Sequence, residues 1–108
     1  MDEFDLDDRS FKQSRGKIYN AIKRDLKERG AWIEPHIDRV ERYMSLWDAA
    51  QMLDFDVKKR GVQIATNTGL KKNDSVALLN ATNKQMEVML EKLQISIPGP
   101  VKDGGADV

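Results

Sequence analysis

The chain has 108 residues, of which 40% are hydrophobic and 33% charged, and its formal net charge is zero. A chain of this length is expected to form one small domain, and small domains often gain stability by self-assembly. The lack of cysteine excludes disulfides, thiolate metal sites and cysteine nucleophiles, and fits a cytoplasmic protein. No apolar run is long enough for a membrane helix, and the acidic start is the reverse of a secretory signal.

The charges are sorted into blocks along the chain, although their sum is zero. Residues 1–8 hold five acids and no base, and residues 9–30 hold eight bases and two acids. Residues 31–56 are acidic again, whereas residues 57–73 hold five bases and no acid. A zero sum argues against strong DNA binding by the chain as a whole, but the two basic blocks are candidate surfaces for a polyanion.

A flexible acidic tail is predicted for residues 1–9, followed by a helical domain over residues 10–96. The first helix is expected to begin with Ser10 as its N-cap and to end at Arg29, with Gly30 just past its end. Its apolar face is predicted to consist of Phe11, Ile18, Ile22 and Leu26.

A second helix is predicted from Pro35, which suits a first helical turn, to a point before Gly61. Leu46 and Leu53 lie on a different side from the main apolar face, which indicates burial beyond a single contact. The main face carries Ile37, Val40, Tyr43, Met44, Trp47 and Ala50.

A short irregular or extended connector is predicted for residues 61–74. The alternation of Val62 and Ile64 is typical of a strand but covers too few residues to predict one, and Thr-Asn-Thr-Gly is a turn signal. At the other end of the chain, residues 97–108 have the composition of a flexible C-terminal tail.

The third helix is predicted to run from a cap at Asn73, Asp74 or Ser75 to about Leu93. Its polar strip is narrow and two apolar patches flank it, which is more apolar surface than one copy can cover. The sequence therefore predicts an all-α protein of three main helices that self-associates. Core packing within one chain must explain most of these residues, and only the surplus apolar surface is assigned to contacts between copies. The predicted contacts between copies are Leu46, Leu53, Val76, Leu79, Met86, Val88, Met89, Leu90 and Leu93.

Basic side chains on the first helix cover about 140° opposite its apolar face, given 100° per residue. Lysine and arginine at such spacing neutralise phosphates, so these residues and the later basic clusters are candidate DNA contacts. A solvated helix face is the alternative interpretation. The candidates are Lys12, Lys17, Lys23, Arg24, Lys27, Lys58, Lys59, Arg60, Lys71 and Lys72.

Features expected of an enzyme are missing from the sequence. Glu34 and Asp38 flank the single histidine, His36, but side chains two positions apart on a helix diverge, so no metal site is expected. There is no Gly-rich phosphate loop and no Gly-x-Ser-x-Gly elbow. We therefore expect no catalytic residues and no cofactor.

The aromatic side chains allow two interpretations. They could stack on bases, but most of them fall on or beside apolar faces, which favours packing of the first helix on the second. The residues are Tyr19, Trp32, Tyr43 and Trp47.

Several segments in order carry a family resemblance over about residues 17–97. They are the Ile-Tyr-Asn-Ala-Ile-Lys helix ending at Gly30, Ile37–Ala50, the Gly61–Gly69 connector, the Lys-Lys-Asn-Asp-Ser cap and the Leu-Gln-Ile-Ser-Ile exit. This order resembles the small subunit of tailed-phage terminases, in the compact family of short helical small subunits found in phages and prophages. Similar proteins carry Asn-Pro where this chain has Asn-Asp, and a Leu-Gly-Leu-like exit where it has Leu-Gln-Ile.

The resemblance implies a ring-shaped homo-oligomer that binds double-stranded viral DNA and regulates the large terminase subunit in the host cell cytoplasm. The large subunit holds the ATPase and nuclease activities, so the chain itself would be non-catalytic. Sequence preference is expected to arise mostly from DNA shape. The alternative is a helical protein-interaction adaptor or regulatory module without DNA binding. An enzyme with a metal or carboxylate site is a third hypothesis, which only a bound metal or activity dependent on His36 would support.

Overall fold

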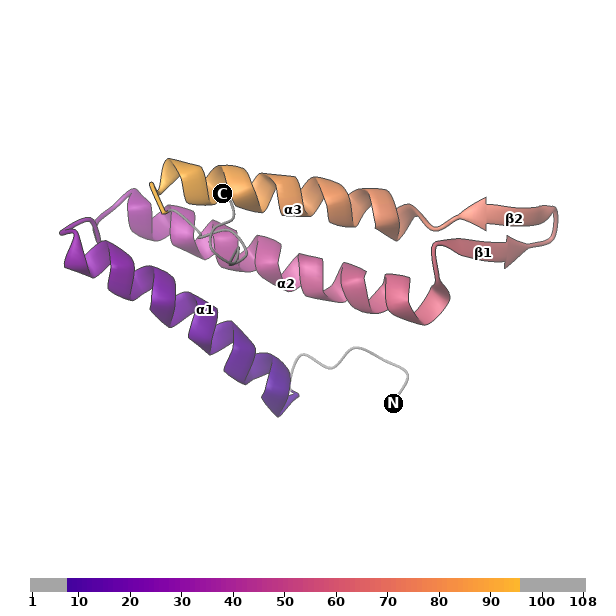
Figure 1. Ribbon diagram of the computed structural model, residues 1–108, viewed down its shortest axis with the longest axis horizontal. Helices are drawn as coiled ribbons and strands as arrows, with labels where there is room; N and C mark the ends of the chain where they lie inside the picture. Colours follow the sequence, from indigo (N-terminus) through magenta and orange to yellow (C-terminus); the bar gives the residue numbers. More distant parts are fainter. Residues whose placement is uncertain (1–7, 96–108) are drawn as a thin grey trace, which may run out of the picture.

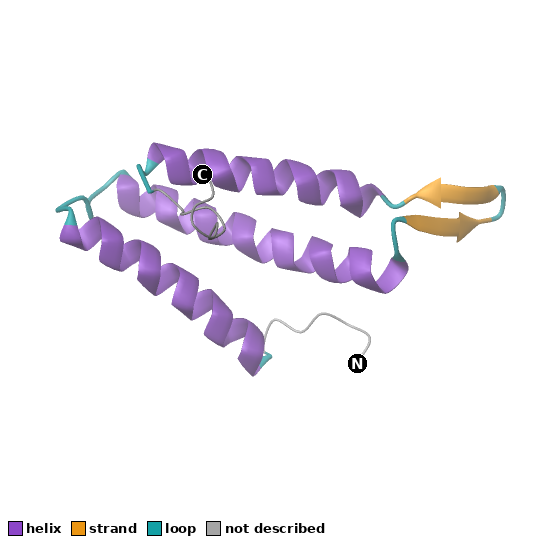
Figure 2. Cartoon of the chain, viewed as in Figure 1, coloured by secondary structure: helices purple, strands orange, loops and turns teal. Residues whose placement is uncertain are grey.

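The computed structural model describes residues 8–95 of the chain. This part consists of three helices and two short strands. In chain order they are α1 (Arg9–Glu28), α2 (His36–Arg60), β1 (Gln63–Thr66), β2 (Gly69–Lys72) and α3 (Asp74–Lys92). The ribbon shows α2 and α3 side by side and antiparallel, with α1 along the first half of α2 (Figure 1). The two strands project beyond the other end of the helix pair (Figure 2).

The helix ends follow local signals in the sequence. Gly61 follows the last residue of α2 with φ 84°, and Asn73 caps α3 by accepting a hydrogen bond from the Ser75 amide, so both predicted boundaries are confirmed. The prediction of Ser10 as the first N-cap is wrong, because the Asp8 carboxylate accepts from the Phe11 amide at 3.1 Å. Aspartate caps as well as serine does, and here it lies two residues earlier.

Both predicted tails fall mainly outside the described residues. Of the acidic segment 1–9, the structure describes only the cap Asp8 and the first helical residue Arg9. Residues 96–108, which include the whole predicted C-terminal tail, lie outside the described part.

The hydrophobic core lies at the end of the molecule where all three helices meet. Leu26 of α1, Met44 of α2 and Leu93 of α3 are almost completely buried there. The rings of Phe11 on α1 and Trp47 on α2 lie 5.3 Å apart between centroids, so the prediction that aromatic side chains pack α1 on α2 is confirmed for Trp47. The core consists of Ile22, Leu26, Val40, Tyr43, Met44, Trp47, Leu90 and Leu93.

The predicted connector is an antiparallel β-hairpin, so the all-α prediction is correct for the helices and incomplete here. Gln63 pairs with Lys72 and Thr66 with Gly69, and residues 67 and 68 form the turn. Only Ile64 among the strand residues is partly buried. Strands this short, exposed on both faces, lack the apolar alternation by which a strand is recognised in a sequence.

Candidate functional site

The structure separates the candidate DNA contacts into two groups. Lys12, Lys17, Lys23, Arg24 and Lys27 lie on α1, whereas the other five lie at the end of α2 and on β2. The α1 group is distributed along that helix. The second group lies at the end of α2, from which the hairpin projects, and on the hairpin itself (Figure 1). One copy of the chain therefore presents two basic surfaces, which we call the α1 surface and the hairpin surface.

On the α1 surface, Lys23 differs from its neighbours. Its ammonium lies 5.3 Å from the centre of the Trp32 ring and 5.8 Å from that of Tyr19, where it makes cation–π contacts. Arg24 and Lys27 are exposed, and neither has an ion pair within residues 8–95. Arg24 and Lys27 are therefore better placed than Lys23 to contact a phosphate.

On the hairpin surface, two basic residues of α2 form ion pairs with acidic side chains of the same helix. Lys58 lies 2.9 Å from Asp54, and Arg60 lies 2.7 Å from Asp56. Lys71 and Lys72 are exposed on β2 and have no ion pair with any described residue. The strongest uncompensated positive charge at this end is thus on the hairpin itself.

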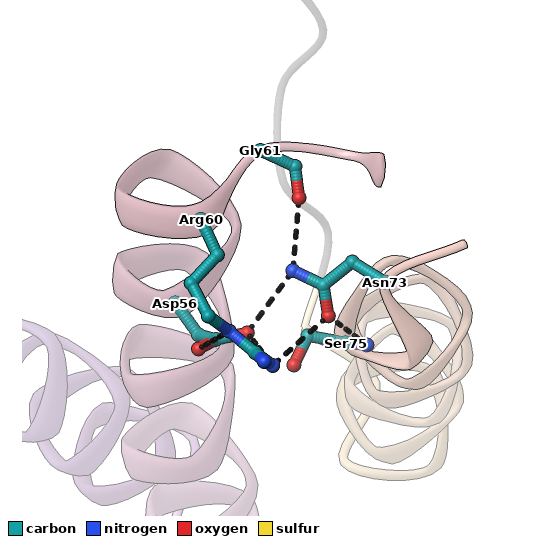
Figure 3. A network of polar contacts seen from close by, with 5 residues as sticks. All are labelled: Asp56, Arg60, Gly61, Asn73 and Ser75. Atoms are coloured by element: carbon teal, nitrogen blue, oxygen red, sulfur yellow. Dashed lines mark hydrogen bonds and ion pairs between the residues drawn. The ribbon is translucent and has the colours of Figure 1, made fainter. Parts of the chain in front are cut away.

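A polar network fixes the base of the hairpin (Figure 3). Asn73 is buried and donates from Nδ2 to the Gly61 carbonyl at 2.9 Å and to Asp56 at 3.2 Å. Its Oδ1 accepts from the Ser75 amide at 3.0 Å and from Arg60 Nη2 at 3.2 Å. The Asn73 amide also donates to the Val62 carbonyl at 2.9 Å. Through its side chain and its backbone N–H, Asn73 thereby joins the end of α2, the segment before β1 and the start of α3.

The network shifts the titration of its charged members. The Arg60 guanidinium donates to both carboxylate oxygens of Asp56, at 2.7 and 2.9 Å, and lowers the pKa of that carboxyl well below its usual range. In turn, the carboxylate raises the pKa of Arg60. The sequence predicted Arg60 as a DNA contact, whereas in the structure its guanidinium is bonded within the chain.

The sequence identified Asn73 only as one of three possible caps. Its bonds to Asp56 and Gly61 join residues 17 and 12 positions apart, which no local pattern reveals. The one available signal was the pairing of a helix-ending glycine with a strong capping residue on either side of a short segment.

The structure brings three of the predicted oligomer contacts together in an open groove between α2 and α3. Leu46, Val88 and Met89 lie on its walls, and the groove has a volume of about 670 Å³. Val88 is 43% exposed. The groove is also lined by Pro35 and by polar or charged residues, namely Asp38, Arg39, Arg42, Ser45, Gln85 and Lys92.

The other predicted contacts are covered to different degrees. Leu90 and Leu93 are buried in the core of the single chain, so the copy itself covers them. Leu78, which was not among the predicted contacts, is 55% exposed on α3. The remaining four are half-buried, namely Leu53, Val76, Leu79 and Met86.

Within residues 8–95, no three histidine, cysteine or acidic side chains are grouped as they would be to hold a metal ion. His36 is partly buried, and its Nδ1 lacks a hydrogen-bond partner among the described residues. No helix in the described part combines the length and the apolar character that a membrane span requires.

The geometry defines a helical protein whose candidate sites are open surfaces, two of them basic and one apolar. Residues 16–98 match the family described as "Phage terminase, small subunit". The chain therefore belongs to the family of phage terminase small subunits, as the resemblance predicted, and the family indicates a role in phage packaging. No curated protein and no solved structure matched the chain. Small subunits of this family are generally non-catalytic.

Proposed function

We propose that the chain is the DNA-binding small subunit of a phage genome-packaging motor, and that it regulates the ATPase and nuclease large subunit. The observation that carries this proposal is the family match over residues 16–98. Its place of action would be the cytoplasm of the host cell, and its partners would be double-stranded viral DNA, the large subunit and further copies of itself.

DNA binding would use both basic surfaces. Arg24 and Lys27 lie at one end of the molecule and Lys71 and Lys72 at the other, and none of them has an ion pair in the described part. A few lysine–phosphate contacts bind weakly, but an assembly repeats them in every copy, so their combined affinity rises steeply. Because the contacts are repeated in every copy, the oligomer can bind DNA even though each chain has a net charge of zero.

Contact between copies would use the groove between α2 and α3 and the outer side of α3. Leu46, Val88 and Met89 provide apolar surface in the groove, and Leu78 lies exposed on α3. Covering these side chains in a closed ring would remove apolar area from water without leaving an open edge for further growth.

Two measurements test the proposal. Light scattering of the full-length protein should give one discrete oligomer, and a fluorescein-labelled 40-base-pair duplex should bind with an affinity that falls steeply as salt rises. The variant Arg24→Glu/Lys27→Glu should weaken binding at least about tenfold at 100 mM salt, because two phosphate contacts become repulsive. In a mixture with the large subunit, the wild-type protein should change the rate of ATP hydrolysis.

The control is Lys84→Glu, at an exposed lysine of α3 outside the α2–α3 groove and on neither basic surface, compared with the single substitutions Arg24→Glu and Lys27→Glu. It should leave DNA binding within about twofold of wild type. A monomer that ignores DNA at 50 mM salt would overturn the proposal. An oligomer that ignores DNA but still alters ATP hydrolysis would instead indicate the protein-interaction adaptor.

A further inference from the structure

The hairpin differs from the rest of the described chain because it is a free ribbon. All strand residues except the partly buried Ile64 are exposed, and the ribbon extends past the ends of α2 and α3 without covering either helix (Figure 1). An isolated two-stranded hairpin is marginally stable in water, so such a ribbon is expected to have a partner that orders it. The ribbon carries no acidic residue, and its two lysines, Lys71 and Lys72, have no ion pair with any described residue. That charge favours a polyanion as the partner.

We propose that the hairpin is a reading ribbon that enters the major groove of DNA tip-first, with Lys71 and Lys72 on the two phosphate walls. The proposal rests on the proposed DNA-binding function and assigns that function to a specific element. The major groove is about 12 Å wide and admits a two-stranded β-ribbon. Because successive strand residues point to opposite faces, Lys71 and Lys72 project toward opposite walls.

The length of the ribbon matches the depth of the groove. Lys71 and Lys72 lie two and three residues beyond Gly69, which pairs with Thr66 next to the turn. At about 3.4 Å per residue, the lysines stand about 7–10 Å behind that last pair, and the turn adds a few ångströms. The major groove is about 8.5 Å deep. With the tip at the floor of the groove, the Cα atoms of both lysines therefore lie at or just above the level of the phosphates, within reach of their long side chains.

The tip carries side chains that suit base edges. Asn67 and Thr68 form the turn, and an amide or hydroxyl can donate to and accept from bases in the major groove. Leu70, which is 70% exposed, pairs with Ala65 on the face that also carries Lys72, where it can contact a thymine methyl group. Direct reading of bases would thus add to recognition of DNA shape.

The Asn73 network gives the ribbon a fixed direction. Asn73 bonds the Gly61 and Val62 carbonyls at one root of the hairpin while capping α3 at the other. Asn73 is therefore a positioning residue, since it touches no DNA but sets the angle at which the ribbon leaves the helices. A ribbon held in this way loses less conformational entropy when it enters the groove.

The test uses the full-length protein and a fluorescein-labelled 40-base-pair duplex of mixed sequence. Replacement of both lysines, Lys71→Gln/Lys72→Gln, should weaken binding at least about tenfold at 100 mM salt and reduce the slope of log K against log salt by about 1.8 per engaged subunit. The control Lys84→Gln, at an exposed lysine of α3 outside the α2–α3 groove, should change neither quantity, whereas Lys71→Gln and Lys72→Gln as single substitutions should each lower the affinity. Dimethyl sulfate probes the groove directly, because it methylates guanine N7 in the major groove and adenine N3 in the minor groove. Wild type should protect guanine N7, and the Lys71→Gln/Lys72→Gln variant should lose this protection.

The other possible results distinguish a failure of the proposed DNA-binding function from a failure of the proposed role of the hairpin. Wild type that retains no duplex at 50 mM salt overturns the proposed function itself. Wild type that binds while Lys71→Gln/Lys72→Gln binds equally well overturns only the role of the ribbon and leaves the α1 surface as the contact. Protection of adenine N3 alone places the protein in the minor groove and overturns the proposal. A smaller oligomer for the hairpin variant in light scattering shows that the ribbon contacts another copy, which also overturns it.

Discussion

The two ends of the α2–α3 pair are held together by different physical forces. At the three-helix end, Leu26, Met44 and Leu93 are removed from water almost completely. At the hairpin end, where α1 does not reach, the buried side chains include Asn73 and Ser75, and the contacts are hydrogen bonds and ion pairs (Figure 3). Hydrophobic burial dominates folding energies, whereas a polar network mainly fixes geometry. The three-helix end therefore supplies most of the stability, whereas the hairpin end fixes the direction in which the hairpin projects.

The largest expected effect is a loss of unfolding free energy when a buried side chain is truncated, and this loss should be greater at the three-helix end than at the hairpin end. Leu26→Ala should lower the free energy of unfolding by about 2–5 kcal/mol, because it leaves a cavity in a fully packed site. Leu53→Ala, at a half-buried position toward the hairpin end, should cost less than half as much. Urea unfolding followed by circular dichroism measures both. Equal losses would break the comparison, since they would mean that a second copy buries Leu53 as deeply as the chain buries Leu26.

The next largest effect is expected from substitutions of Asn73, the central residue of the polar network at the hairpin end. Asn73→Ala removes the cap of α3 and leaves the Gly61 carbonyl without its side-chain donor, so it should cost about 2 kcal/mol in unfolding free energy. Asn73→Ser is the matched control, because serine restores the cap acceptor but does not supply the donor to Gly61 and Asp56. It should recover about half of the loss. No difference between serine and alanine would show that the cap contributes little and that the links to α2 carry the effect.

A smaller effect is expected in the dependence of stability on pH, because Asp56 is ion-paired in the folded chain. The pKa of Asp56 is lowered in the folded chain, mainly by its hydrogen bond to Arg60. A depressed folded pKa contributes stability above the unfolded pKa of about 3.9, and this contribution is lost as pH falls below that value. The melting temperature of wild type should therefore exceed that of Asp56→Asn at pH 6, and the gap should narrow from pH 5 to pH 2. A gap that stays constant with pH would show that Asp56 contributes through packing instead of charge.

The same comparison explains what the sequence could predict. Gly30, Gly61 and Asn73 mark helix boundaries through local chemistry, and all three predictions are confirmed. Leu78 lies in the apolar arc of α3 yet is exposed, because helical periodicity gives relative angles but does not say which part of an arc faces α2. The hairpin and the Asn73 network depend on how α2 and α3 approach each other. The family was recognisable from the order of segments, whereas the roles of the individual basic residues remain predictions.

The smallest effect lies between the two ends, where Arg15 of α1 donates to both carboxylate oxygens of Asp48 of α2, at 2.7 and 3.1 Å. Their side chains are 37% and 29% exposed, so solvent screens the pair and a coupling of about 0.5 kcal/mol is expected. A double-mutant cycle with Arg15→Met and Asp48→Asn measures it. The pair Arg42–Asp38 is the control, because its side chains are 68% and 58% exposed within a single helix and its coupling should be smaller. The Arg15–Asp48 coupling energy could instead exceed the loss of unfolding free energy in Asn73→Ala. Polar contacts would then also hold α1 on α2, and the division of the molecule into a packed end and a polar end would be wrong.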